Sequence, residues 1–252
     1  MNWNAIMGFI STLALLAPIV FIFSLRLGNY RSFPALAIYF SLVFLYNLFT
    51  EGYLSANENF IRYWGITNNF LDAPVMLTFL SYFSTSIKQT KRLRLVTGLL
   101  LLFDLVIIAV KGFNVESSII IMAPGLIIVL GYCLLFFVRQ TKISILHQKA
   151  LGKALMITSQ LFAYGCYLLI YLLYYVYKMH NVADTFLIYF IVSTLASGLL
   201  CTGLVIEKKR ILKLEELKQT RRELTSLYNG SETKTTIPLK TVALDFDKEQ
   251  WH

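Results

Sequence analysis

The residues of this sequence that could do chemistry lie inside long apolar segments, where polar side chains are costly. Asn68, Asn69 and Asp72 interrupt the hydrophobic segment Trp64–Phe83, and Asn68 stands one helical turn before Asp72. An ionisable group in the middle of a membrane span costs at least about 2.5–3.5 kcal/mol on insertion scales, so it usually faces a partner or a cavity. Asp72 with Asn68 therefore indicates a functional site, because amides alone would pack at lower cost.

Other apolar segments carry polar side chains at helical spacing. One such set recurs at steps of three and four residues, which places its members on one face of a helix: Gln160, Tyr164, Tyr167, Tyr171 and Tyr174. The candidate ligand- or ion-binding residues are Asp72, Asn68, Asn69, Asn47, Asp104, Tyr164, Tyr167, Tyr171 and Ser193. Together they predict an outward-facing, tyrosine-lined cavity with Asp72 at its floor. Such a cavity would suit a cation, a proton or an amphipathic ligand.

The same residue types also have purely structural interpretations. Tyrosines near a membrane boundary, such as Tyr174, commonly form an interfacial aromatic belt. Serines spaced by four residues, such as Ser193 and Ser197, allow helices to pack closely. Asp104 stays open between two interpretations: it either contributes to a site or is a protonated carboxyl that bonds a neighbouring helix.

The elements that must position these residues are membrane helices. Of the 252 residues, 57% are hydrophobic and only 15% are charged, which is typical of a multi-pass membrane protein. We predict an all-α integral membrane protein of the cell membrane, with a bundle of seven transmembrane helices. The predicted spans are Ala5–Leu25, Pro34–Leu54, Trp64–Phe83, Leu95–Val110, Ser118–Val138, Ala154–Tyr177 and Thr185–Ile206.

The distribution of charge between the spans predicts their orientation. Basic residues gather after the first, third, fifth and seventh spans, at Arg26, Arg31, Lys88, Lys91, Arg92, Arg94, Arg139, Lys142, Lys149, Lys153, Lys208, Lys209 and Arg210. The alternate loops carry few charges, and these are balanced. The positive-inside rule then places the N-terminus outside and the C-terminus in the cytoplasm. The net charge of +9 follows from this bias, and we expect no nucleic-acid partner.

The chain is predicted to divide into three parts. Residues 1–206 form the transmembrane domain in the lipid bilayer, residues 207–228 a charged cytoplasmic juxtamembrane helix, and residues 229–252 a flexible cytoplasmic tail. An apolar stripe runs along the juxtamembrane helix at Ile211, Leu214, Leu217, Leu224 and Leu227. This stripe indicates either a short coiled coil, with a homodimer or cytoplasmic protein as partner, or an amphipathic helix on the membrane surface.

Several patterns that would indicate an enzyme do not occur in the sequence. It contains no P-loop, no HExxH motif and no serine elbow. The three histidines, His147, His180 and His252, are too dispersed for a membrane di-iron site, and the three cysteines lie inside apolar segments. We therefore expect neither a metal site nor an enzymatic activity.

Two short segments are slightly similar to microbial rhodopsins. Residues Val192–Leu199 look like the retinal-binding helix of that family, and Arg62–Pro74 like its proton-path helix. Leu195 stands where the resemblance requires the Schiff-base lysine, and no lysine lies at mid-membrane. The resemblance therefore implies no covalent retinal, and we expect no cofactor.

These features favour a sensory or receptor-like seven-helix module that signals through its C-terminal helix. The alternative is a proton- or ion-coupled transporter or channel that uses Asp72 and Asp104. A membrane-embedded lipid enzyme is the least favoured of the three. An intramembrane carboxylate is consistent with the first two, while the lack of an internal repeat counts against a carrier built from inverted repeats.

Orientation can be tested by labelling of introduced cysteines with a membrane-impermeant thiol reagent. Cysteines at Glu58, Glu116 and Asn181 should react from outside intact cells, whereas cysteines at Thr90 and Gln148 should react only after the membrane is permeabilised. Reversed labelling at any two of these positions would contradict the predicted topology.

Overall fold

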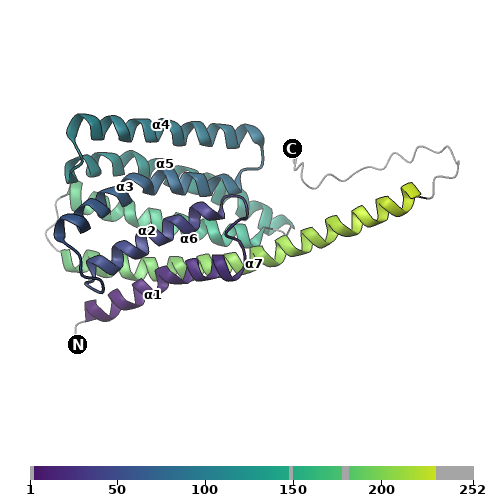
Figure 1. Cartoon of the computed structure of the whole chain (residues 1–252), viewed down its shortest axis with the longest axis horizontal. Helices are drawn as coiled ribbons and strands as arrows, with labels where there is room; N and C mark the ends of the chain where they lie inside the picture. The colour runs from purple at the N-terminus through teal and green to yellow at the C-terminus, as the bar shows by residue number, and fades with distance from the viewer. Residues whose placement is uncertain (1–2, 148–149, 178–181, 231–252) are drawn as a thin grey trace. The chain divides into compact units, whose positions relative to one another are not determined.

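The computed structural model is helical throughout most of the residues it describes, which are 3–147, 150–177 and 182–230. The elements are α1 (Trp3–Ser24), α2 (Phe33–Thr50), α3 (Glu58–Leu80), the short 3-10 helix η1 (Ser81–Phe83), α4 (Ile87–Lys111), α5 (Val115–His147), α6 (Leu151–Tyr171), the short π-helix η2 (Leu172–Val176) and α7 (Val182–Gly230). Helices α1 to α6 and the first part of α7 lie side by side (Figure 1). The predicted all-α class is confirmed.

Six of these helices are long and apolar enough to cross a membrane. The qualifying segments are Ile6–Ser24, Phe33–Thr50, Ile87–Lys111, Val115–Leu146, Leu151–Val176 and Leu187–Thr225. The chain is thus consistent with a multi-pass helical membrane protein. Helix α3, the remaining predicted span, is long enough with its 23 residues but is not among the six, since Asn68, Asn69 and Asp72 lower its hydropathy.

The polar helix α3 is surrounded by other helices. It packs against α2, α4 and α5. The main contacts of α4 are with α3, α5 and the short helix η1. Figure 1 accordingly shows α4 at one edge of the bundle, beside α5 and α3. This arrangement places Asn68, Asn69 and Asp72 of α3 where neighbouring helices can offer hydrogen-bond partners, and it leaves the apolar segment of α4 at the periphery.

The helix ends follow local capping signals. The Asn57 side chain accepts a hydrogen bond from the backbone N–H of Asn59, and the Ser86 side chain accepts one from Gln89, so α3 and α4 begin well before the apolar segments predicted as spans. Gly112, with φ of 81°, ends α4 in a conformation that favours glycine. Beyond the predicted fifth span, α5 continues to His147. His147, which the sequence places in a loop, is therefore helical.

Helix α7 is held between α1 and α6 by small and hydroxyl-bearing residues. The Ser11 and Ser193 hydroxyls form a hydrogen bond of 2.6 Å between α1 and α7, and the Ser159 hydroxyl of α6 donates to the Ala196 carbonyl of α7 at 2.7 Å. Toward the end of the bundle that carries Lys153, a Cβ added at Gly152 would lie 2.7 Å from the backbone nitrogen of Glu207. The backbones of α6 and α7 therefore touch at this crossing.

The chain divides into two compact units, Met1–Glu207 and Lys208–His252. In the second unit, α7 continues as helix to Gly230, and Leu214, Leu217 and Leu224 are exposed. Residues 231–252, most of the predicted tail, lie outside the described residues, as do Lys149, Lys178 and His180. The location and flexibility predicted for that tail remain predictions.

The close crossing of α6 and α7 predicts a sharp difference between two glycine substitutions. Gly152→Ala should destabilise the bundle by about 1–3 kcal/mol, because the added methyl meets backbone that cannot move aside. Thermal unfolding of the purified variants measures the effect. Gly198→Ala on α7 is the matched control, since apart from its chain neighbours and the adjacent backbone of α7 no described atom lies within 4 Å of the position that its added Cβ would take, and it should be neutral or slightly stabilising. Equal melting temperatures for the two variants would contradict the close crossing.

Candidate functional site

The centre of the candidate site is a hydrogen-bonded pair that joins α3 to α6. The Tyr164 hydroxyl donates to the Asp72 carboxylate and lies 3.1 Å from both of its oxygens. Tyr164 is completely buried and Asp72 is half-buried. The Tyr39 side chain of α2 interacts with both residues. Three helices thus contribute a phenol, a carboxylate and a second phenol to one point inside the bundle.

The two residues that follow Asp72, Ala73 and Pro74, shape the local structure and packing of α3. Pro74 lies inside α3 and has no backbone N–H, so one carbonyl of the preceding turn lacks its usual helical donor. Ala73, the residue between Asp72 and Pro74, lies so close to Gly125 of α5 that a Cβ there would be 3.0 Å away. Small residues on that side bring α5 close and leave the Asp72 side chain directed to α6. The described hydrogen bonds do not include the pairing between Asn68 and Asp72 that their spacing suggested.

A row of tyrosines continues from this pair toward α7. The rings of Tyr164 and Tyr167 are 5.8 Å apart, centroid to centroid, and those of Tyr167 and Tyr189 are 5.9 Å apart. Aromatic pairs at this separation attract one another beyond the area they bury. Two members of the predicted tyrosine stripe, Tyr164 and Tyr167, therefore lie in contact, and Tyr167 also contacts Tyr189 of α7.

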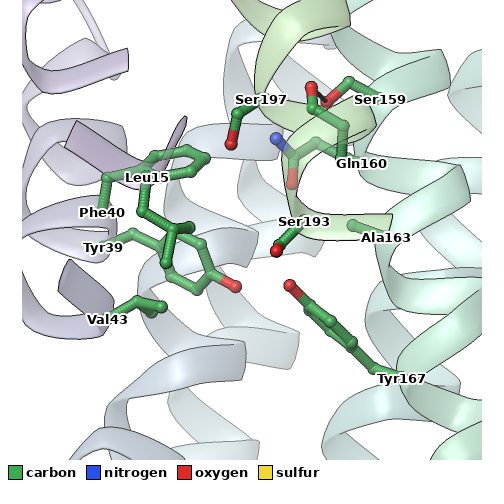
Figure 2. A pocket seen from close by; sticks show the side chains of 11 residues that line it. Leu15, Tyr39, Phe40, Val43, Ser159, Gln160, Ala163, Tyr167, Ser193 and Ser197 are labelled. Carbon is green, nitrogen blue, oxygen red and sulfur yellow. Dashed lines mark hydrogen bonds between the residues drawn. The ribbon is translucent and has the colours of Figure 1, made fainter. Parts of the chain in front are cut away.

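A small polar cavity lies beside the tyrosines. Figure 2 shows the hydroxyl groups of Tyr39, Tyr167 and Ser193 directed into a common space, with Gln160 and Ser197 close by. The cavity volume is about 10 Å³, which is about the room that one water molecule needs. The cavity accommodates a water molecule or a small ion, and a larger ligand would require the helices to separate. Its lining includes Tyr39 and Tyr167 but not Asp72, which was predicted to form its floor.

Other predicted site residues connect helices away from this cluster. The Asn69 side chain donates to the Ser118 hydroxyl of α5 at 2.9 Å, and the Tyr171 hydroxyl donates to the Ile119 carbonyl at 3.2 Å. Both contacts fasten neighbouring helices to α5. Asn68 is half-buried, whereas Asn47 is buried and its side-chain nitrogen has no hydrogen-bond partner in the described part of the chain.

Asp104 stands apart from the cluster. It lies on α4 and is only 1% exposed, and within residues 3–147, 150–177 and 182–230 neither of its carboxylate oxygens has a hydrogen-bond partner. No described hydrogen bond connects Asp104 to Asp72 or to the tyrosines. Of the two interpretations left open for Asp104, a hydrogen bond to a neighbouring helix does not occur among the described residues. A role beside Asp72 finds no contact to support it, because α4 packs against α3 and α5 and has no principal contact with α2 or α6.

Several residues of the site were not among the sequence candidates. Tyr39 and Gln160 lie on polar stripes of their helices, so helical periodicity was the signal that could have identified them. Ser11, completely buried on α1 against Ser193, has no such signal in its apolar surroundings. Leu195, the position where the rhodopsin resemblance would need a lysine, is 54% exposed, whereas Ser193 lines the cavity.

The described residues contain no group of three or more histidine, cysteine, aspartate or glutamate side chains that could hold a metal ion. Comparisons with protein families, with curated proteins and with solved structures found no match to this chain. The basis for a functional assignment is thus the geometry of the site and the arrangement of the helices.

The role of the phenol can be tested by removing its hydroxyl. Tyr164→Phe leaves the Asp72 carboxylate inside the bundle without its donor, and we expect the free energy of unfolding to fall by about 1–3 kcal/mol. Chemical or thermal unfolding of the purified protein measures the change. Tyr174→Phe, at an exposed tyrosine, should change stability by less than about 0.5 kcal/mol. A silent Tyr164→Phe variant would mean that the pair does not stabilise the bundle.

Proposed function

We propose that this chain is a sensory, receptor-like membrane module in which the state of the Asp72 site is transmitted along α7. The observation that carries the proposal is the continuity of α7. This helix contributes Tyr189 to the tyrosine row and Ser193 to the cavity, and it extends without interruption to Gly230. One continuous helix therefore runs from the site into the second unit.

The chemistry of Asp72 supports a response to a proton or a small cation. A charge inside a low-dielectric bundle interacts strongly with the groups around it, so a change in the charge of Asp72 alters the preferred hydrogen bonding of Tyr164 and Tyr39. Tyr167 packs against Tyr164 on one side and Tyr189 on the other. The tyrosine row thus offers a continuous path of packed side chains from α3 to α7.

The contacts of Glu207 support transmission from the bundle to the C-terminal segment. The Tyr82 hydroxyl of η1 donates a hydrogen bond to Glu207, the last residue of the first unit. Glu207 is completely buried and lies against Gly152 of α6. A shift of α7 at Ser193 would have to be accommodated at Glu207, because a helix transmits axial movement over its length.

The exposed leucines of the second unit would then pass the change of state to a partner. Leu214, Leu217 and Leu224 form the exposed part of the predicted apolar stripe. In this proposal they contact a cytoplasmic protein or a second copy of the chain, and attachment to the membrane surface is the other option. The proposal also includes an outside N-terminus, an outward-facing site, a cytoplasmic C-terminus and residence in the cell membrane.

The second candidate function is a proton- or ion-coupled carrier or channel. Asp104 favours it, since a buried carboxylate with no described hydrogen-bond partner is a natural proton or cation site. Against it, Asp104 is not joined to the Asp72 cluster. A lipid enzyme is the least supported function, because the cavity holds only a water-sized species, and we propose no catalytic activity.

The test compares Asp72→Asn with Asp104→Asn in a response assay. A spin label is placed at Leu217, which is exposed, in a background where Cys133, Cys166 and Cys201 are alanine. Changes of pH, Na⁺ and K⁺ are applied to the full chain in lipid nanodiscs. We expect one of these to change the mobility of the label or its distance to a second copy, and Asp72→Asn to abolish this change while the protein stays folded.

The outcomes separate the two candidate functions. Asp104→Asn should retain the response of a sensor. If both variants instead eliminate proton or cation flux in liposomes that the parent protein supports, the carrier is the correct function. A full response in Asp72→Asn, or an unresponsive label in the parent protein under all conditions, would contradict the sensor proposal.

A further inference from the structure

A second hollow lies away from the Asp72 site, over the end of α3 between α2 and α4. Its volume is about 460 Å³, within the range of roughly 300–1,000 Å³ typical of small-molecule sites. Arg31 and Arg94 line it together with the hydroxyl groups of Ser32, Ser81 and Thr97. No carboxylate is among its lining residues. The Ser81 and Thr97 hydroxyls donate to the backbone carbonyls of Thr78 and Leu93, so the two guanidinium groups are the donors that the hollow offers to an occupant.

The rest of the lining is apolar. Leu77 and Leu93 form buried parts of the wall, and Ile38 on α2 is 53% exposed. Ile38 lies within the apolar segment Phe33–Thr50, so the hollow is continuous with a helix surface that is apolar enough for lipid. An occupant would have a negatively charged end at the arginines and an apolar end along α2.

Arg31 is held in place by its surroundings. Its φ angle of 46° lies in the left-handed region, which is uncommon for a residue other than glycine, asparagine or aspartate. The loop is fastened by a hydrogen bond of 2.8 Å between the Ser32 and Ser81 hydroxyls, and the Arg31 guanidinium lies 5.6 Å from the centre of the Tyr30 ring. Holding the side chain in position before binding reduces the entropy lost when a ligand is bound.

The electrostatics of α4 also favour an anion. Its N-terminal part carries Lys88, Lys91, Arg92 and Arg94, and no acidic residue stands in the first turn. These like charges repel one another, so an anion beside them is favourable. Within the described residues, neither Arg31 nor Arg94 forms an ion pair with a carboxylate. A negatively charged ligand from outside the chain would supply the missing compensation.

We propose that this hollow is a binding site for an anionic phospholipid of the surrounding bilayer. The phosphate accepts hydrogen bonds from the Arg31 and Arg94 guanidinium groups, whose planar donors match phosphate oxygens. The acyl chain lies along α2 past Ile38. Basic pockets between membrane helices are suited to such headgroups. This site is independent of the sensor proposal, since it involves neither Asp72 nor the tyrosine row.

The experiment measures the apparent affinity of the full chain, in neutral detergent micelles, for phosphatidylglycerol and for phosphatidylcholine with the same acyl chains. Native mass spectrometry counts the bound lipid. Phosphatidylglycerol should bind more tightly, and Arg31→Asn and Arg94→Gln should each weaken it about tenfold, as expected for the loss of a charged hydrogen-bond donor. Asparagine is used at Arg31 because it tolerates the left-handed backbone.

Arg92→Gln is the matched control. It removes the same charge two residues from Arg94, at an exposed position that does not line the hollow, and should leave the affinity for phosphatidylglycerol within about twofold. Thr97→Trp, which fills the hollow without changing charge, should also weaken binding. It replaces Arg31→Asn as the test variant if Arg31→Asn does not fold.

Three results would overturn the proposal. Equal affinity for the two lipids would mean that the site does not recognise an anion. An equal loss of affinity in Arg92→Gln would show a diffuse attraction to the basic surface. Displacement of the lipid by millimolar inorganic phosphate, with phosphate alone giving the same rise in melting temperature as the lipid, would identify a soluble anion as the occupant.

Discussion

The bundle is organised around the hydrogen bonds between Asp72 and Tyr164. A carboxylate inside an apolar structure is costly unless a donor reaches it, and the described donor is the Tyr164 hydroxyl of another helix, not Asn68 in the preceding turn of α3. The Tyr164 side chain of α6 reaches Asp72 of α3, and Tyr39 of α2 interacts with the same carboxylate. The row of tyrosines and the water-sized cavity are formed where these helices meet.

Close contacts with α1 and α6 determine where α7 lies beside this centre. At Ser193, α7 is bonded to α1, and at Gly152 its backbone touches α6 at Glu207. These two contacts hold α7 against α1 and α6 at separate points along its length. The hollow with Arg31 and Arg94 is built differently, from the loop at Arg31, the end of α3 and neighbouring parts of α2 and α4. The bundle thus combines an enclosed polar centre with a second hollow that contains two arginines.

Much of the fold was predictable because a membrane helix can be recognised from the length and hydropathy of its own segment. Each apolar segment found in the sequence corresponds to a helix, since length and hydropathy decide whether a segment can cross the hydrocarbon core. Helix α3 also forms where the sequence predicts it, but its polar residues exclude it from the six helices that are apolar enough by themselves to cross a membrane. Helix ends were less predictable, because caps such as Ser86 extend helices beyond their apolar parts.

Residue type and spacing along single helices were enough to predict the helical membrane class, the polar character of α3, and the stripe that places Tyr164 and Tyr167 on one face. Which stripes meet could be learned only from the packed bundle. It joins Asp72 to Tyr164 instead of Asn68, brings Ser11 to Ser193, and leaves Asp104 apart on α4. The physical reason is that a stripe defines the direction of a face within one helix, whereas its partner depends on how separate helices pack, through small contacts such as those at Gly125 and Gly152 that no periodicity records.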